Sequence, residues 1–350
     1  MIGTPFALQD SPRTKYCRLM VFLILLLILA FVVSLGIGRI PISMAEVLRI
    51  FTSWVSQQPP DPQLSGKAMV FTLVRLPRCL LAVLLGMGLS VSGAVYQGLF
   101  RNPLVSPDIL GVSAGATFGA ALGLLLPGSS FVMIQLLAFV FGLAAVSMAL
   151  AIARVVAVKP VLVLVLAGLV VLSVFNSSIT LLKFLSDPYN ELPAIVFWIM
   201  GSVSRAEWKD LYTALPLVCG GLIIVGLLRY KLNVLSLGDL QTKSIGLNPG
   251  VYRILLIAVS SVMVAVSVST CGQICWIGLV IPHIARTLVG PNHEIMIPVT
   301  ALIGGIFLLL ADTLARTLTM AELPISVVTA FSGAPIFAYL LYRNRGSGWA

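Results

Sequence analysis

The sequence predicts an all-α, polytopic membrane protein with about ten transmembrane helices and both termini in the cytoplasm. Hydrophobic residues make up 59% of the 350 residues and charged residues 10%, which is too little polar surface to cover a water-soluble globule. The mean hydropathy of +1.07 agrees with this class. Apolar runs of about 20 residues, the length that crosses a hydrocarbon core of about 30 Å, recur along the chain.

Ten such spans are expected, separated by turn-rich or charged segments. Residues 1–350 are expected to form one transmembrane domain, with 1–18 as a cytoplasmic tail and 229–251 as a long cytoplasmic segment. The apolar stretch 193–204 is too short to cross, and we expect a re-entrant or interfacial helix on the outer side. The expected spans are 19–38, 77–99, 109–126, 131–153, 161–182, 211–228, 252–270, 273–289, 296–314 and 325–342.

The basic residues set the orientation of these spans. With the N-terminus inside, 13 of the 22 lysines and arginines lie on the inner side and nine on the outer side. This excess is the pattern that places both termini in the cytoplasm. The net charge of +10 therefore indicates membrane topology, although in a soluble protein it would suggest nucleic-acid binding.

Several classes of function are disfavoured. The chain contains no GxxxxGK[ST] loop, so any ATPase must be a separate subunit. Ionisable residues are missing from the middle thirds of the predicted spans, and residues such as Asp312, Arg316 and Lys183 sit near outer ends, which counts against an ion-coupled secondary transporter. An intramembrane enzyme would need a nucleophile with its base, an acidic dyad or a metal cluster, and the spans carry none of these patterns.

No metal site or bound cofactor is expected in this chain. Cys271 and Cys275 share a helical face, but membrane thiols usually pack as small hydrophobic groups. His283 has no carboxylate or thiol close by in the sequence, so we expect it to pack or to cap a helix end.

Two spans carry regular side-chain patterns. Gly111, Gly115, Gly119 and Gly123 recur every four residues and form a smooth seam that another helix can approach closely. The fifth span carries a polar stripe at positions i, i+3, i+4 and i+7, which comprises Ser173, Asn176, Ser177 and Thr180. Such a stripe either bonds to a neighbouring helix or faces a water-filled pathway, and the residues alone leave both alternatives open.

From about residue 70 onward, a series of short strings resembles the FecCD-type permeases of ABC importers. Together they are specific, because they occur in the family's order along the rest of the chain. They are Arg75-Leu76-Pro77-Arg78, Ser92-Gly93-Ala94, Gln97 to Leu104, Pro107 to Gly115, Gly278 to Arg286, Ala311 to Arg316, Glu322-Leu323-Pro324 and Gly333-Ala334-Pro335.

The resemblance implies a type II importer permease, with ten helices per subunit and a substrate path between two subunits. It further implies two cytoplasmic ATPase subunits that bind ATP and Mg²⁺, an external binding protein, and the bacterial inner membrane as location. Family members carry metal chelates such as ferric siderophores, haem and cobalamin, and some carry oxyanions such as molybdate. We expect a homodimer, and no enzymatic activity in this chain itself.

The resemblance also assigns roles to residues. The fifth span lines the path in this family, which favours the pathway alternative for the polar stripe. The loop that enters this span holds a cytoplasmic gate, here Val161 and Leu162, which could close by dewetting or could simply start a helix. The segment between the sixth and seventh spans couples to the ATPase, and its residues here are Gly238, Asp239, Thr242 and Gly246.

An outer docking surface for the binding protein is expected at Arg75, Arg78 and Arg316. The predicted topology places all three at outer span ends, and a guanidinium fork suits the acidic residues that binding proteins of this class present. The alternative is that Arg78 anchors a helix end and that Arg316 pairs with Asp312 one turn earlier.

Overall fold

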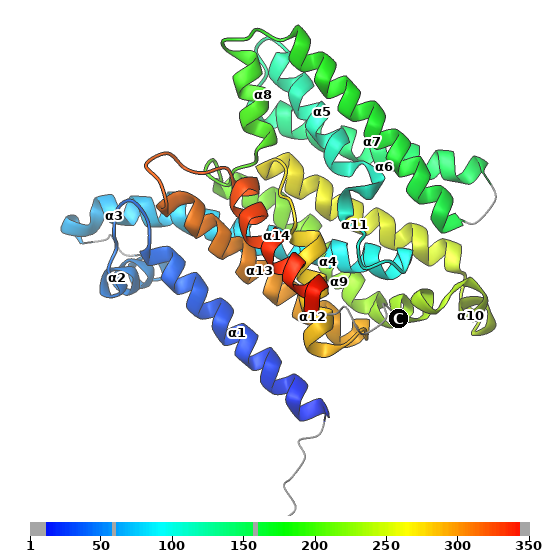
Figure 1. Ribbon diagram of the computed structural model, residues 1–350. Helices are drawn as coiled ribbons and strands as arrows, with labels where there is room; N and C mark the ends of the chain where they lie inside the picture. The colour runs from blue at the N-terminus through cyan, green and yellow to red at the C-terminus, as the bar shows by residue number, and fades with distance from the viewer. Residues whose placement is uncertain (1–11, 58–60, 157–159, 344–350) are drawn as a thin grey trace, which may run out of the picture.

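The structure, a computed structural model, describes residues 12–57, 61–156 and 160–343. In these ranges the regular structure is helical throughout, as predicted for an all-α protein (Figure 1). The elements are α1 (Pro12–Gly36), α2 (Met44–Val55), η1 (Pro62–Leu64), α3 (Ser65–Met69), η2 (Val70–Arg75), α4 (Leu76–Phe100), η3 (Pro107–Leu110), α5 (Val112–Leu125), α6 (Phe131–Val155), α7 (Pro160–Leu185), α8 (Glu191–Ile199), α9 (Trp208–Leu237), α10 (Asp239–Ser244), α11 (Pro249–Cys271), α12 (Ile277–Val289), α13 (His293–Thr317) and α14 (Ile325–Arg343).

Each of the ten predicted spans coincides with an apolar helix. Seven of the described helices are long and apolar enough to cross a membrane, and three shorter apolar helices, α5, α12 and α14, occupy the remaining positions. The predicted spans 109–126 and 273–289 are only partly α-helical, because α5 begins at Val112 and α12 at Ile277. The predicted tail 1–18 lies largely outside the described residues, and α1 already begins at Pro12.

The described chain begins and ends on the same side of the helix bundle. Arg75, which precedes α4, donates to the Leu35 carbonyl at the end of α1. Arg78 at the start of α4 binds Glu322, which precedes α14. The end of α1 and the start of α14 therefore share one side, and the start of α1 and the end of α14 share the other, as an even number of spans requires.

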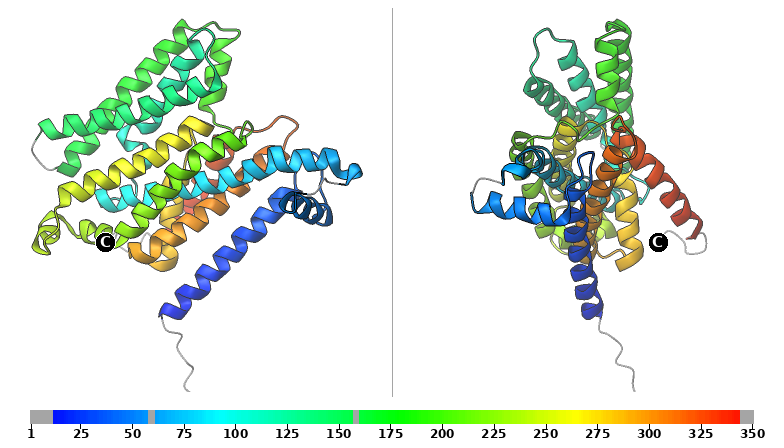
Figure 2. Two further views of the ribbon diagram at one scale, coloured as in Figure 1. Left: turned by 180° about the vertical axis from the view of Figure 1, so that it is seen from behind. Right: turned by 90° about the vertical axis from the view of Figure 1, so that its left-hand side faces the viewer.

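The centre of the bundle is α4, in which nearly every side chain is buried against α9, α11, α12 and α13 (Figure 2). Glycines bring the helix backbones together. A Cβ atom on Gly93 would lie 1.8 Å from the Gly278 carbonyl of α12, and one on Gly86 would lie 2.3 Å from the Gly304 carbonyl of α13. Small residues at such crossings allow the close packing that holds membrane helices together.

The glycine seam of the third span packs against α6. A Cβ atom on Gly115 or Gly119 would lie 2.4 Å from the Phe141 carbonyl or 2.2 Å from the Leu137 carbonyl. The seam therefore serves helix packing. Gly111 differs, because its φ of +80° ends η3 and sets the direction in which α5 begins.

The connection between α9 and α11 is more helical than predicted, and the predicted short outer helix packs against the bundle. The expected inner segment 229–251 is helical up to Leu237, so the turn between α9 and α11 is shorter than predicted. The stretch 193–204 holds part of the short helix α8, in which Ile195 is buried. The Trp198 carbonyl of α8 lies 2.3 Å from a Cβ atom placed on Gly272, so α8 packs on the end of α11.

Candidate translocation site

The polar stripe of α7 lies on an exposed face of the described chain. Ser173, Asn176, Ser177 and Thr180 are all exposed. The Ser173 hydroxyl donates to the Leu169 carbonyl of its own helix at 2.8 Å, and the Thr180 hydroxyl donates to the Asn176 carbonyl at 2.9 Å. No hydrogen bond from the stripe to another helix occurs among the described residues. Within one subunit the stripe is therefore free to face a second subunit or a pathway.

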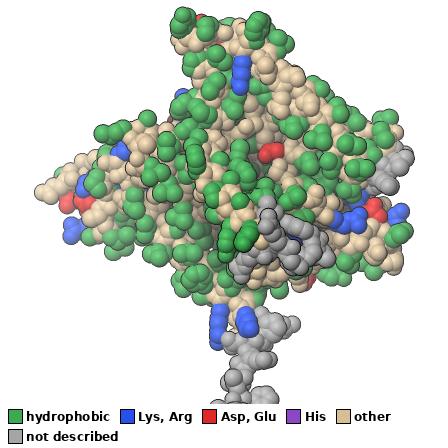
Figure 3. Space-filling model, in the orientation of Figure 1, with side chains coloured by type: hydrophobic (Ala, Val, Ile, Leu, Met, Phe, Trp, Pro, Cys, Tyr) green, Lys and Arg blue, Asp and Glu red, His purple; other side chains and the backbone are tan. Residues whose placement is uncertain are grey.

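The helices α7 and α14 flank the same face of the molecule (Figure 1). Large apolar side chains are exposed along both, among them Leu169 of α7, and Phe331 and Tyr339 of α14. Figure 3 shows this face as mostly hydrophobic and hollowed near its middle, where an acidic side chain is visible. An exposed apolar face of this extent on a membrane protein suits contact with a second subunit or with lipid.

The predicted gate residues line a cavity of about 580 Å³ at the start of α7. Val161 and Leu162 form one wall, Arg101 and Asn102 after α4 form another, and Asp239 of α10 completes the lining. The cavity therefore brings the predicted gate next to the predicted coupling segment.

The predicted coupling residues surround the short helix α10. Gly238 and Gly246 have φ values of +126° and +78°, so backbone conformations that favour glycine lie on both sides of this helix. Asp239 binds Arg253 of α11 at 2.6 Å, which fixes α10 to the bundle. The Leu240 side chain is 81% exposed and is the apolar group that α10 presents to its surroundings.

Thr242 is not a surface residue. Its side chain is fully buried, and its hydroxyl donates to the carbonyls of Val234 and Gly238. Thr242 therefore holds α10 against the end of α9 and cannot contact another subunit directly. Its assignment to the coupling segment stays a prediction, and Thr242 would act there by holding α10 in place, a role that the sequence did not distinguish from direct contact.

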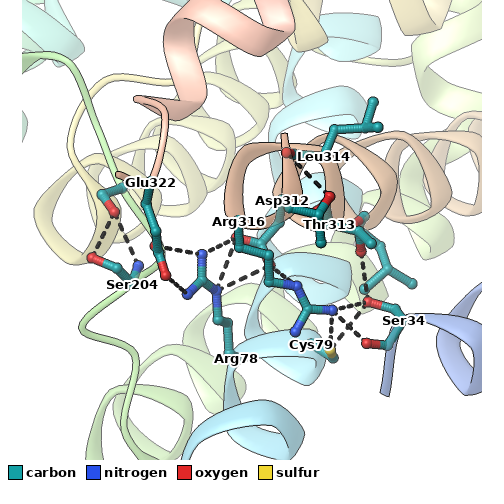
Figure 4. A network of polar contacts seen from close by, with 12 residues as sticks. Ser34, Arg78, Cys79, Ser204, Asp312, Thr313, Leu314, Arg316 and Glu322 are labelled. Atoms are coloured by element: carbon teal, nitrogen blue, oxygen red, sulfur yellow. Dashed lines mark hydrogen bonds and ion pairs between the residues drawn. The ribbon is translucent and has the colours of Figure 1, made fainter. Parts of the chain in front are cut away.

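The three arginines of the expected docking surface are buried in a polar cluster (Figure 4). Arg75, Arg78 and Arg316 are 3%, 4% and 5% exposed. Arg78 binds Asp312 of α13 at 2.9 Å and Glu322 at 3.0 Å. A guanidinium that is buried and bound to two carboxylates of its own chain is not accessible to the acidic groups of an external protein.

The other two arginines of the cluster hold the end of α1. Arg75 donates to the carbonyls of Leu35, Gly36 and Ile40. Arg316 donates to the Ser34 hydroxyl at 2.7 Å and lies 4.0 Å from Asp312. The three arginines therefore do not form an exposed docking surface in this structure, and Arg78 rather than Arg316 is the closer partner of Asp312.

Exposed arginines on the outer side are found elsewhere. Arg205 lines a cavity of about 490 Å³ between α8 and the ends of α5 and α11. Arg39, in the connection between α1 and α2, is also exposed. In the sequence, only the position of Arg39 and Arg205 in predicted outer loops indicated that they are exposed.

The cysteines and His283 behave as small or packed groups. Cys271 is buried, and the part of the chain that the structure describes contains no cluster of ligating side chains that could hold a metal ion. His283 is buried with its ring edge-on to Phe337 of α14, at 5.8 Å between ring centroids. This histidine therefore packs α12 against α14.

Sequence and structure comparisons identify the family. A model of the FecCD transport family matches residues 26–343. The molybdate import system permease protein MolB of Haemophilus influenzae is 38% identical over 336 residues, which cover 95% of this chain and 98% of that protein. The permease assigned to an iron chelatin transport system in Helicobacter pylori is 43% identical over 287 residues, or 82% and 86% of the two chains.

A solved structure agrees with the sequence matches. A transporter assigned to the metal-chelate ABC type, in an inward-facing conformation, superposes with a TM-score of 0.83 at 38% identity, and the match covers 93% of this chain and 99% of that one. A family match along nearly the whole chain and the same fold lead to one conclusion. This chain belongs to the FecCD transport family and is a multi-span permease of the ABC transporter type.

Proposed function

We propose that this chain is the permease subunit of an importer that moves a metal chelate across a bacterial inner membrane into the cytoplasm. The observation that carries the proposal is the exposed polar stripe of α7, which runs from Ser173 to Thr180 and bonds to no other helix among the described residues. Hydroxyl and amide groups on an otherwise aliphatic helix provide a wettable wall for a polar cargo. The similarity to the Helicobacter iron chelatin permease supports the class of cargo.

The hollowed face requires a second subunit to close a path. A second copy of this chain, related by a two-fold axis, would place two α7 stripes opposite each other. Val161 and Leu162 from each copy would then form an aliphatic constriction at the inner end, which can close by excluding water.

Energy would come from a separate ATPase subunit that binds ATP and Mg²⁺. The exposed Leu240 on α10 provides an apolar contact for such a subunit, and the Asp239–Arg253 ion pair would pass a displacement of α10 to α11. On the outer side, a binding protein would deliver the cargo, and Arg39, Arg49 and Arg205 are among the exposed arginines that acidic groups of such a protein could contact.

An oxyanion is the second candidate cargo. The Haemophilus relative that matches almost the whole chain is a molybdate import permease. The two candidates differ in charge and size, so transport measurements separate them directly.

The test is ATP-dependent uptake into proteoliposomes that contain the permease, its ATPase and its binding protein. ⁵⁵Fe-labelled ferric hydroxamate, haem, cobalamin and ⁹⁹Mo-molybdate are each offered as cargo. Accumulation of a chelate that needs ATP and all three components supports the proposal. Accumulation of molybdate alone would establish the second candidate, and ATP-independent uptake by the permease alone would overturn both.

A further inference from the structure

A carboxylate lies deep in the bundle, beside the hollowed face. Asp108 belongs to η3, the short turn between α4 and α5. The charge count assigned it to the inner side, but the structure places η3 about half-way along α4. Pro107 lies 2.4 Å from a Cβ atom placed on Gly278, and that same atom lies 3.2 Å from the carbonyl of Leu89, near the middle of α4. Asp108 therefore lies at mid-depth, although none of the predicted spans contains it.

Two interrupted helices meet at this depth. The chain folds back into the bundle after α4 and turns at Gly111, whose φ is +80°, before α5 continues outward. The residues after α11 fold inward in the same way and turn at Trp276, whose φ is +70°, before α12 continues. Irregular backbone at membrane depth is tolerated where it is buried in protein or lines a water-filled cavity.

Asp108 lies between the two helices that flank the hollowed face. On one side, the Ile109 carbonyl lies 2.2 Å from a Cβ atom placed on Gly168 of α7. On the other side, Pro107 packs against Gly278, three residues after Cys275, and Trp276 packs on Phe337 of α14 at 6.3 Å between centroids.

The Asp108 side chain is partly exposed and has one bonded partner among the described residues, the hydroxyl of Ser113. In the described ranges, no lysine or arginine forms an ion pair with it. A carboxylate inside a membrane protein without a cationic partner is costly unless it faces water or a ligand. The bond from Ser113 occupies one oxygen of Asp108 and leaves its other oxygen unbonded.

We infer that Asp108 is a specificity-determining residue that lines the translocation path at mid-depth and selects cationic or hydrogen-bond-donating metal chelates over anions. This inference rests on the proposed function, because it needs a path between α7 and α14. It separates the two candidate cargoes, since a carboxylate on the path repels a molybdate dianion and attracts a chelate that carries positive charge or N–H and O–H donors.

A purely local role for Asp108 would be to cap the start of α5 through Ser113. Asparagine tests this, because its side-chain oxygen can still accept the Ser113 hydroxyl although the charge is gone. Asp108→Glu keeps the charge and alters the shape. Together the two variants distinguish the effect of the Asp108 charge from the effect of its bond to Ser113.

The first experiment measures the charge sensed at Cys275 in the assembled permease–ATPase complex. In a background with Ser in place of the other four cysteines, Cys275 is reacted with a cationic and an anionic methanethiosulfonate reagent of similar size. We expect the cationic reagent to react faster by on the order of ten-fold, because a carboxylate in the same part of the path attracts a cation and repels an anion through partly screened charge interactions. The ratio of the two rates cancels changes in thiol reactivity that affect both reagents equally.

The variants decide whether Asp108 is the cause. Asp108→Asn should abolish the preference for the cationic reagent, and Asp108→Glu should retain it. Glu294→Gln, which removes an exposed carboxylate at the start of α13, is the matched control and should leave the preference unchanged. Equal rates for both reagents in the native sequence, or complete protection of Cys275 in every nucleotide state, would overturn the inference.

The second experiment uses the uptake assay. Asp108→Asn should lower the ATP-dependent uptake of a cationic ⁵⁵Fe-hydroxamate chelate several-fold, whereas Asp108→Glu should retain most of it. Molybdate uptake by the native sequence, or unchanged chelate uptake by a folded Asp108→Asn variant, would overturn the inference. Absence of uptake with every cargo would count against the proposed function, while the thiol experiment would still report whether Asp108 sets the charge beside Cys275.

Discussion

Arg78 at the start of α4 binds Asp312 of α13 through two nitrogens, Nε at 3.0 Å and Nη2 at 2.9 Å. The same guanidinium donates to both oxygens of Glu322 at 3.1 and 3.0 Å. These partners lie 234 and 244 positions away in the sequence. One side chain therefore joins α4, α13 and the segment before α14.

Replacement of Arg78 by Gln should destabilise the permease strongly. Asp312 is fully buried, so loss of Arg78 leaves it with only the more distant Arg316, 4.0 Å away, and breaking a buried ion pair typically costs about 3–5 kcal/mol. Thermal unfolding of the detergent-solubilised protein measures the effect. Lys67→Gln is the control, because its partly exposed ion pair with Glu46 should contribute less than about 1 kcal/mol. Equal unfolding midpoints for the two variants would contradict the structural role of Arg78.

Gly93→Ala should impair folding, whereas Gly220→Ala should be tolerated. The added methyl group at Gly93 would lie 1.8 Å from the Gly278 carbonyl, so α4 and α12 would have to separate. At Gly220, on α9, no atom lies within 4 Å of the added carbon, and Ala favours a helix by about 1 kcal/mol. The yield of monodisperse protein and its unfolding midpoint measure both effects. A normal Gly93→Ala protein would mean that these helices lie farther apart.

Leu240→Asp should abolish uptake while leaving the fold intact. The side chain is exposed on α10, so a charge costs nothing in the isolated subunit but disrupts an apolar contact with the ATPase. Co-purification of the two subunits and uptake per ATP hydrolysed measure the loss. Thr242→Val should behave in the opposite way, with lower stability and retained binding, because Thr242 bonds only within its own chain. Normal co-purification and uptake in Leu240→Asp would exclude α10 as the contact.

Cysteines at Ser173, Asn176, Ser177 and Thr180 should react with water-soluble thiol reagents in at least one nucleotide state. Val174 and Leu181 are the comparison positions. They are 51% and 57% exposed in the single chain, so they should be protected only when lipid or a second subunit covers them in the assembled complex. Rates are measured in proteoliposomes on a background without native cysteines. Uniform protection of all six positions would assign the polar stripe to helix contacts.

Hydropathy predicted where the helices lie because burial in lipid acts on every residue of a span. It could not predict the breaks at Gly111 and Trp276, where a change of backbone direction leaves the apolar composition unchanged. For the same reason Asp108 was placed near the inner surface, because a proline and a glycine beside it, Pro107 and Gly111, are compatible with an ordinary loop before a span as well as with an interrupted helix.

The arginine cluster shows another limit. The sequence located Arg78 and Arg316 at the outer ends of their spans and offered Asp312 as a neighbour of Arg316. In the structure Arg78 holds Asp312 at 2.9 Å, and Arg316 remains 4.0 Å from it. Which arginine pairs with Asp312 depends on how distant helices pack together. That packing cannot be read from a single sequence.

The helix α9 runs without interruption from Trp208 to Leu237, a length of about 45 Å. Only Gly238 separates it from α10, and the Thr242 hydroxyl of α10 bonds to the carbonyls of Val234 in α9 and of Gly238. At the opposite end, the Trp208 indole donates to the Thr72 carbonyl at 2.9 Å. No flexible loop separates α10 from α9. A displacement of α10 would therefore be transmitted along α9 to the other side of the membrane, where α9 contacts the segment that precedes α4.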